Sequence, residues 1–462
     1  MEKAKDERSF RFHLSFAASW FILIALVTPV AGAGPVMEAG VARADITPPQ
    51  GVQMWGYFDR LSPAQGTIDP LYARVLVLEV DDQRMALVDL DLGRTFGPKS
   101  LQQLREAVRQ SSGINSLLVS AIHTHAGPVV MDKYSAGTPT WEKTALSRIE
   151  LAIQQASRQA VPVRLGTGYG VAYIGYNRRR VNPDGTVTML WNNTARVPTA
   201  PVDPVVTVLR VDRMDGTPLA VLVNYACHPV TFGPDDLDYS ADFPGVMCNL
   251  VEKALAGHPL CFFLQGAPGD INVYDAGTPV KDGAVARRDW AGDRLGQEVV
   301  RVAKRIRTAE DPDPSLQFAE DDLPFRLRWD ADKFREETLR EIGPKSFQIY
   351  SPPIRTRMEL PVTTALINKR IAIMGMPGEP FVQFQMSWRA LCPTEECLFL
   401  GYTNGYFGYF PTIQAATEGG YGAANATTWV QVGAGERMVD HALIKVYQML
   451  GRLQDAPRTG WK

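Results

Sequence analysis

The stretch LYARVLVLEVDDQRMALVDLDLG, residues 71–93, decides the fold class of this chain. It holds two nearly continuous runs of β-branched and aliphatic residues, at 71–80 and 84–93. Runs of this kind are typical of neighbouring strands in a sheet that is covered on both faces. We therefore expect a buried β-sheet with helices packed against it.

Predicted strands and helices alternate along the rest of the chain. Residues 97–113 have the apolar spacing of a helix and end at a glycine, and residues 116–122, SLLVSAI, form the next strand. The pattern continues with strands at 204–212, 219–230 and 260–270 and with helices at 141–159, 243–257, 293–307 and 436–450. The charged stretch 309–322 is the best candidate for a linker or a surface excursion. The expected fold class is mixed α/β, with mixed sheets flanked by helices in one large domain, residues 34–462.

The composition favours a globular protein with a small-molecule partner. The chain has 462 residues, of which 45% are hydrophobic and 21% charged, which suffices for one large domain. The formal net charge of −2 is spread over both signs without a long basic run. We therefore expect no nucleic-acid partner.

The first residues differ from the rest of the chain. Positive charges, among them Lys3, Lys5 and Arg8, precede an apolar run at 14–27, and small residues follow up to Ala33. This pattern predicts a signal peptide over residues 1–33 and a secreted or periplasmic protein. The apolar run is short for a membrane span, and an uncleaved membrane anchor is the alternative.

The cysteines do not suggest a metal site. Cys392 and Cys397 are close enough for a small disulfide loop if the backbone turns, whereas Cys227, Cys248 and Cys261 lie in apolar surroundings typical of buried thiols. No pair has the CxxC spacing. A metal ion would therefore be bound by histidine, carboxylate or phenolate groups.

Five polar residues share one kind of position. His123, His125, His228, Asp270 and Glu379 each come just after a predicted apolar strand. In α/β architectures the carboxyl ends of strands line the ligand crevice, so residues from several strands can meet in one site. We expect the functional site at these strand ends.

The two histidines of SAIHTHAGP, residues 120–128, would face the same side of an extended segment. An isolated pair of this kind is more often solvated or part of a core, but His228 ends another strand in the same way. Neutral imidazole suits zinc, and Glu379 would add a carboxylate ligand. The alternative for Glu379 is a carboxylate that the helix dipole favours.

Tyrosines and aspartates extend the candidate set. The segment GYTNGYFGYF supplies Tyr402, Tyr406 and Tyr409, which would line a cleft or coordinate a metal. Asp242 and Asp270 stand in turns rich in glycine and proline. Each would brace a loop or hold a ligand histidine in one tautomer.

An ordered set of motifs resembles a known family. The motifs are HTHAGP, NRR, YACHPV, YSADFPG, QGAPGDIN, PGEPF, NGYFGYFPT and EGGYGA, and the similarity runs from residue 42 to about residue 422. Together they resemble the neutral/alkaline non-lysosomal ceramidases and their bacterial relatives. That family hydrolyses the amide of ceramide to a fatty acid and sphingosine.

The resemblance implies a role for each site residue. It implies that four residues ligate one zinc ion per chain: His123, His228, Glu379 and Tyr409. It implies that His125 is an unliganded neighbour able to move a proton, that Arg178 is an active-site arginine and that Tyr421 points at the substrate carbonyl. Zinc lowers the pKa of a bound water to about 7 and so supplies the nucleophile for amide hydrolysis. The expected substrate is a ceramide-like or other lipid-like N-acyl compound, and peripheral membrane contact is compatible with it.

Two departures distinguish the chain from that family. Asn272 stands where the family carries a serine implicated in catalysis, so this residue could donate a hydrogen bond but could not act as a nucleophile. The chain also ends at Lys462, and we expect it to lack an immunoglobulin-like C-terminal domain. Two alternative functions follow. One is a non-catalytic zinc-containing binding protein of the same fold, and the other is a two-metal phosphoesterase, which would need a GNH[DE] element.

Overall fold

Strands β3 (Tyr72–Val80) and β4 (Gln83–Leu90) form an antiparallel pair, as the sequence predicts. The computed structural model describes residues 34–131, 140–350 and 354–453. The predicted signal peptide, residues 1–33, lies outside the described residues. Within the described part of the chain, none of the helices combines the length and the apolar character that a membrane crossing requires.

The β3–β4 pair belongs to a mixed eight-stranded sheet. Its strands, in spatial order, are β13 (Leu260–Gln265), β11 (Pro218–Tyr225), β10 (Val205–Arg213), β6 (Val161–Val171), β1 (Glu38–Asp45), β3, β4 and β5 (Ser116–Ala121). The β4–β5 and β11–β13 pairs are parallel, and the other neighbours are antiparallel. A second, four-stranded sheet has the order β15 (Leu316–Arg326), β16 (Arg357–Ile367), β17 (Ile371–Gly375) and β19 (Glu396–Leu400).

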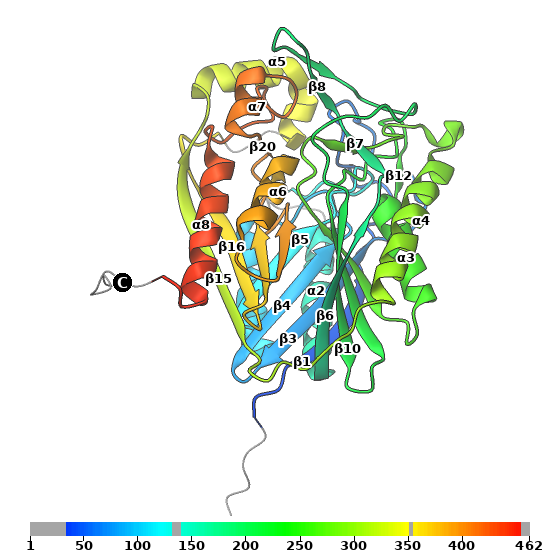
Figure 1. Ribbon diagram of the computed structural model, residues 1–462. Coiled ribbons are helices and arrows are strands. Elements are labelled where there is room, and N and C mark those ends of the chain that lie inside the picture. Colours follow the sequence, from blue (N-terminus) through cyan, green and yellow to red (C-terminus); the bar gives the residue numbers. More distant parts are fainter. Residues whose placement is uncertain (1–33, 132–139, 351–353, 454–462) are drawn as a thin grey trace, which may run out of the picture. The chain divides into compact units, whose positions relative to one another are not determined.

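Helices flank these sheets and also lie near one of their ends (Figure 1). The helices are α1 (Pro98–Ser112), α2 (Thr140–Arg158), α3 (Asp242–Ala254), α4 (Ala284–Ala303), α5 (Ala331–Tyr350), α6 (Val382–Leu391), α7 (Ile413–Glu418), α8 (Ala434–Met449) and the 3₁₀ turn Val280–Asp282. Short strands pair as β2 (Gly66–Thr67) with β12 (Asp238–Tyr239), β7 (Gly175–Asn177) with β14 (Ile271–Val273), β8 (Arg179–Val181) with β9 (Val187–Met189), and β18 (Glu379–Pro380) with β20 (Tyr409–Phe410). The expected mixed α/β class is confirmed.

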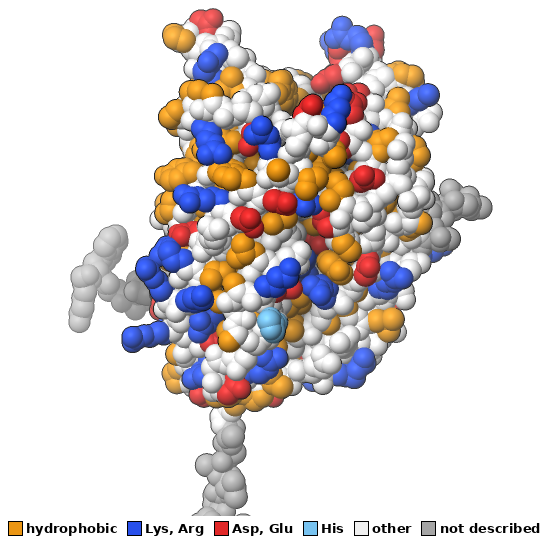
Figure 2. Space-filling model, turned by 90° about the vertical axis from the view of Figure 1, so that its right-hand side faces the viewer, with side chains coloured by type: hydrophobic (Ala, Val, Ile, Leu, Met, Phe, Trp, Pro, Cys, Tyr) orange, Lys and Arg blue, Asp and Glu red, His pale blue; other side chains and the backbone are white. Residues whose placement is uncertain are grey.

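Both faces of the first sheet are buried, which explains the continuous apolar runs. On β3, Val75 and Val77 belong to a core that includes Leu101 of α1. The alternate residue Leu76 belongs to a second core, with Phe262 of β13. Because side chains alternate across a strand, burial on both faces requires apolar residues at nearly every position. On the surface shown in Figure 2, by contrast, acidic and basic side chains are interspersed among apolar ones.

The predicted linker at 309–322 is wrong in its second half. Strand β15 begins at Leu316 and pairs with β16 along its whole length. Its carboxylates find partners on distant elements: Glu320 binds Arg105 of α1 at 2.8 Å, and Asp321 binds Lys445 of α8 at 3.0 Å. The charges at 320–322 therefore belong to a paired strand, whereas those at 310–313 precede it.

One glutamine joins the strand ends that carry the histidines. The side-chain amide of Gln265, the last residue of β13, donates to the carbonyl oxygens of Ile122 and Cys227, at 2.8 and 2.9 Å. These carbonyls directly precede His123 and His228 in the sequence. The ends of β5, β11 and β13 are thereby held together, so the histidines meet at one edge as the sequence predicts.

Candidate active site

Backbone carbonyls fix the rings of His123 and His228. Nδ1 of His123 lies 2.6 Å from the carbonyl oxygen of Gly93, and Nδ1 of His228 lies 2.6 Å from that of Pro268. A carbonyl oxygen can only accept, so Nδ1 carries the proton and Nε2 keeps its lone pair in each neutral ring. Burial lowers the pKa of His228 to about 4, which keeps this ring neutral at pH 7.

Glu379 faces both of these lone pairs. Its Oε2 lies 3.2 Å from Nε2 of His228 and 3.4 Å from Nε2 of His123. Burial raises the pKa of this carboxyl, but positive charge at the neighbouring histidines, His123 above all, and hydrogen bonds from them outweigh burial and hold it well below its usual range. Glu379 is therefore an ionised carboxylate.

The site thus gathers electron pairs that need a cation. Two imidazole Nε2 atoms and a carboxylate oxygen are all acceptors, and acceptors at 3.2 to 3.4 Å repel one another unless a proton or a metal ion lies between them. Histidines whose other nitrogen donates to a carbonyl are the usual arrangement around a bound metal. The residues therefore fit a metal ion. The potential ligand atoms of His123, His125 and His228 all lie within 4.8 Å of one another.

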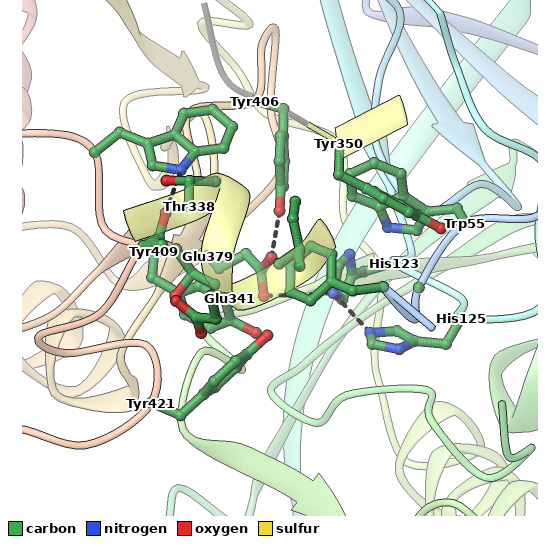
Figure 3. Close-up of a pocket in the computed structure, with 16 residues that line it drawn as sticks. Trp55, His123, His125, Thr338, Glu341, Tyr350, Glu379, Tyr406, Tyr409 and Tyr421 are labelled. Carbon is green, nitrogen blue, oxygen red and sulfur yellow. Dashed lines mark hydrogen bonds and ion pairs between the residues drawn. The ribbon is translucent and has the colours of Figure 1, made fainter. Parts of the chain in front are cut away.

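His125 differs from the other two histidines. Its Nε2 lies 3.2 Å from Nε2 of His123 (Figure 3), whereas its buried Nδ1 has no hydrogen-bond partner among the described residues. Burial lowers its pKa well below the usual value, and the two neighbouring histidines add to this effect. The unpartnered nitrogen is available to accept and pass on a proton. The unliganded role expected for His125 stays a prediction, since its ligand atom lies within 4.8 Å of those of His123 and His228.

Tyrosine hydroxyls hold the carboxylate in place. Tyr406 donates to Oε1 of Glu379 at 2.5 Å, and Tyr402 donates to Oε2 at 3.2 Å while its ring stacks on His123. All three tyrosines of this segment were expected to line a cleft or coordinate a metal, and the resemblance implied a ligand role for Tyr409 alone. Tyr409 belongs to β20, which pairs in parallel with β18, and this pairing places Tyr409 opposite Glu379.

Arg178 lies against Tyr409 and Tyr421. Its Nη2 donates to the Tyr409 hydroxyl at 3.0 Å and to the carbonyl oxygen of Gly269 at 2.7 Å. Its guanidinium carbon lies 5.2 Å from the ring centre of Tyr421. Its Nη1 donates to Oδ1 of Asn272 at 3.2 Å. Asn272 therefore accepts a hydrogen bond here, and it positions the arginine.

A pocket opens beside these residues (Figure 3). It encloses about 630 Å³, counting the open mouth, and reaches from the histidines to helix α5. Its lining includes His123, His125, Glu379, Tyr409 and Tyr421 among the predicted site residues. His228, Arg178 and Asn272 lie behind this lining.

The two predicted aspartates brace loops. Asp242 accepts hydrogen bonds from Thr231 at 2.7 and 2.8 Å, and Asp270 accepts from the backbone of Val382 and from Asn177. Neither carboxylate contacts a site histidine, because backbone carbonyls already hold those rings. Of the two roles that the sequence left open for these residues, loop bracing is the observed one.

Several site features leave no recognisable signal in the sequence. Trp55, Gly56 and Tyr350 line the pocket from segments that carry none of the motifs. Gly56 has φ +114°, and a Cβ there would come within 2.8 Å of His125. Only glycine adopts this conformation without strain and leaves the histidine its space. Tyr350 and Thr338 come from α5, which the sequence analysis did not predict.

The sequence is similar to that of known ceramidases. Residues 37–262 match the family described as neutral/alkaline non-lysosomal ceramidase, N-terminal. Neutral ceramidase B of Dictyostelium discoideum is 25% identical over 273 residues, which cover 54% of this chain and 37% of that protein. The chain therefore spans a little over a third of the length of this curated relative.

The fold is also similar to solved structures. The neutral ceramidase from Pseudomonas aeruginosa superposes with a TM-score of 0.72 at 18% identity, covering 91% of this chain and 75% of that chain. A ceramidase complexed with C2 gives a TM-score of 0.71 at 18% identity, covering 92% of this chain and 76% of that chain. The structural similarity includes the region beyond residue 262, where Glu379, Tyr409 and Tyr421 lie.

Proposed function

We propose that this chain, which belongs to the neutral/alkaline non-lysosomal ceramidase family, is a zinc-dependent hydrolase that cleaves the amide bond of an N-acyl substrate. One observation carries the proposal. The lone pairs of His123 and His228 and the carboxylate of Glu379 converge at 3.2 to 3.4 Å, an arrangement that a divalent cation would stabilise.

The proposed zinc ligands are His123, His228, Glu379 and Tyr409, with one ion per chain. A zinc ion bound there supplies Lewis acidity and lowers the pKa of water to about 7. Zinc is preferred because imidazole nitrogen and a carboxylate oxygen form one of its usual catalytic ligand sets.

The protein's own groups handle the proton and the carbonyl. His125 lines the pocket, and its Nδ1 has no partner among the described residues, so this nitrogen can take a proton from water and return it to the leaving amine. Burial raises the pKa of Tyr421 to about 12, so its hydroxyl stays protonated and can donate to the developing oxyanion. The positive charge of Arg178, which lies beside Tyr409 and Tyr421, also stabilises the negative charge that develops on this oxyanion.

The shape of the pocket supports a lipid-like substrate. Its walls are largely aromatic, and rings such as Trp55, Phe58 and Tyr406 offer apolar contact to an acyl chain. The relatives named as ceramidases make ceramide a natural first substrate to test. The wider role would lie in sphingolipid or other lipid metabolism, and peripheral membrane contact would give access to such substrates.

We also propose that the protein is secreted or periplasmic, on the basis of the predicted signal peptide. The test is N-terminal sequencing of the protein recovered from each cell fraction. A mature N-terminus near residue 34 outside the cytoplasm would support the proposal, and an intact N-terminus on cytoplasmic protein would refute it.

The first test of the function is metal analysis of purified protein. Wild type and His123→Ala are compared after a check of folding by circular dichroism. We expect one zinc per folded wild-type chain and none in the variant, followed by hydrolysis of N-acyl substrates. Folded wild type that takes up no zinc would refute the metal site. Zinc without turnover of any amide would favour the binding protein, and turnover of aryl phosphates would favour a phosphoesterase.

A further inference from the structure

Helix α5 supplies one wall of the pocket. Three residues of one helical face line the pocket: Thr338 and, one turn later, Glu341 and Ile342. The helix bends at Gly343, where φ is +74°, before Pro344. Beyond the bend, the hydroxyl of Tyr350 donates to the carbonyl oxygens of Met54 and Tyr57 at 2.9 and 3.1 Å. The wall is therefore fixed to the strand-end loops.

Glu341 lines the pocket without an ion-pair partner among the described residues. Its Oε1 accepts a hydrogen bond from Nδ2 of Asn425 at 3.2 Å, and no lysine or arginine of the described residues forms an ion pair with it. Glu337, one turn earlier, is paired with Arg340 and does not line the pocket. Both glutamates are exposed, so they differ in pairing and in position relative to the pocket.

The rest of the pocket suits an organic cation. Glu341 is the acidic residue of the described lining that the proposed metal site does not use, and neither lysine nor arginine occurs among the described residues that line the pocket. Aromatic rings surround the space, including Trp429, Tyr421 and Tyr406. Faces of aromatic rings attract cations, and a carboxylate beside such rings adds a counter-charge. Arg178 contacts the ring of Tyr421 but lies outside the lining.

We propose that Glu341 makes the pocket selective for substrates with a positively charged amine portion, namely N-acylated diamines that keep one free ammonium group. This inference rests on the proposed function and adds the substrate class. The ammonium group lies against Glu341, and the aromatic walls cover its methylene chain. N-acylated amino acids, which carry a free carboxylate, are disfavoured by the same charge.

The experiment compares three amides that share one acyl chain. Their amine portions are a diamine, an amino alcohol and an amino acid, which are cationic, neutral and anionic. We expect Glu341→Gln to lower kcat/KM for the diamine amide about five- to tenfold, mainly through KM, and to leave the neutral amide unchanged. Glu341→Lys should reverse the preference toward the anionic amide. Glu337→Gln is the matched control and should change none of the three values.

A binding measurement separates this inference from the proposed hydrolysis. Calorimetry with a long-chain N-alkyl diamine, which has no amide bond, reports the cation site without turnover. Weaker binding of the diamine to Glu341→Gln than to wild type supports the inference even if no amide is cleaved. Absence of amide cleavage would refute only the proposed hydrolase activity. Equal binding to wild type and Glu341→Gln, together with unchanged selectivity, would overturn the inference and leave the hydrolase standing.

A second inference comes from the turn between α6 and β19. The sulfurs of Cys392 and Cys397 both contact the hydroxyl of Thr394, at 3.4 and 3.2 Å. Cys392 is partly exposed, whereas the other four cysteines are buried. Its contacts with Cys397 and Thr394 lower the pKa of Cys392 to about 7, which favours the reactive thiolate.

We infer that Cys392 and Cys397 form a disulfide by exchange with a small-molecule disulfide. The Cys392 thiolate attacks and releases one small thiol, and the Cys397 thiol then displaces the second, so two protein hydrogens leave with two small thiols. The bond would link α6, which follows Glu379, to β19, which leads to Tyr402.

The test is peptide mapping after oxidation with glutathione disulfide and alkylation of free thiols. We expect a peptide about 2 Da lighter that joins Cys392 and Cys397, and a mixed disulfide on Cys392 in the Cys397→Ser variant. Cys248→Ser is the control and should still form the bond. Alkylation of both Cys392 and Cys397 in oxidised, folded protein would overturn the inference.

Discussion

The Nε2 atoms of His123 and His125 lie 3.2 Å apart, yet the two rings are held in different ways. Nδ1 of His123 is bound to the carbonyl oxygen of Gly93, while the buried Nδ1 of His125 has no partner among the described residues. A metal ligand needs the first arrangement, and a proton carrier needs a nitrogen that is free to change its protonation.

The two histidines should therefore respond differently to substitution. We expect His123→Ala to lose the metal and all activity. His125→Ala should keep the metal and lose activity about 100- to 10,000-fold, because general acid–base catalysis typically contributes that much. Metal content and kcat measured on the same folded samples check this. Loss of the metal from His125→Ala would instead make His125 a ligand.

The lowered pKa of His228 predicts a pH dependence for the metal-free protein. Its pKa is about 4 when folded and about 6.5 in an unfolded chain, so protonation favours the unfolded state. The contribution to stability is complete above pH 6.5 and is lost as the pH falls toward 4, by about 3 kcal/mol. The low pKa of His125 acts in the same direction.

Urea unfolding of the metal-free protein at pH 7, 5.5 and 4 measures this loss. His228→Asn removes the titrating group, so its free energy of unfolding should fall less steeply over the same range. His258→Asn is the control, because that histidine is exposed. Parallel pH profiles for wild type and His228→Asn would show that His228 is not the group responsible.

The hydrogen bond between Arg178 and Asn272 predicts coupled effects. Arg178→Ala should lower kcat about 100-fold or more, because a charge that favours the oxyanion is lost, and should leave the metal bound. Asn272→Ala leaves the arginine in place with one contact fewer, so we expect about a tenfold loss. The double variant should resemble Arg178→Ala alone, since Asn272 acts through the arginine. Additive losses would show an independent role for Asn272.

The elements that could be predicted from the sequence are those with local signals. The apolar runs at 71–80 and 84–93 predict two buried strands, because burial on both faces requires apolar side chains at nearly every position. His123, His228 and Glu379 could be placed together because each comes within a few residues after the end of such a strand. Both inferences use only neighbouring residues, so no knowledge of distant contacts is needed.

The remaining features depend on partners far apart in the chain. Strand β15 was mistaken for a linker because Arg105 and Lys445, which neutralise its carboxylates, come from other elements. The tautomers of the site histidines are fixed by backbone carbonyls, which every residue has and which leave no mark on the sequence. The pocket wall of α5 depends on the contact of Tyr350 with Met54, which lies 296 positions away in the sequence.

Tyr406 offers a test of how the carboxylate is held. Its hydroxyl donates to Oε1 of Glu379 at 2.5 Å, and Tyr402 donates to the other oxygen. A hydrogen bond to a charged group contributes about 1.5 to 3 kcal/mol, and loss of such a supporting partner typically weakens metal binding 10- to 100-fold. We expect Tyr406→Phe to weaken zinc binding by that factor, as measured by competition with a chelator. Tyr447→Phe, on helix α8, is the control. Unchanged zinc affinity in Tyr406→Phe would mean either that Glu379 keeps its position without this bond or that zinc binding does not depend on Glu379. The Glu379→Gln variant distinguishes these two explanations, because it removes the charge itself.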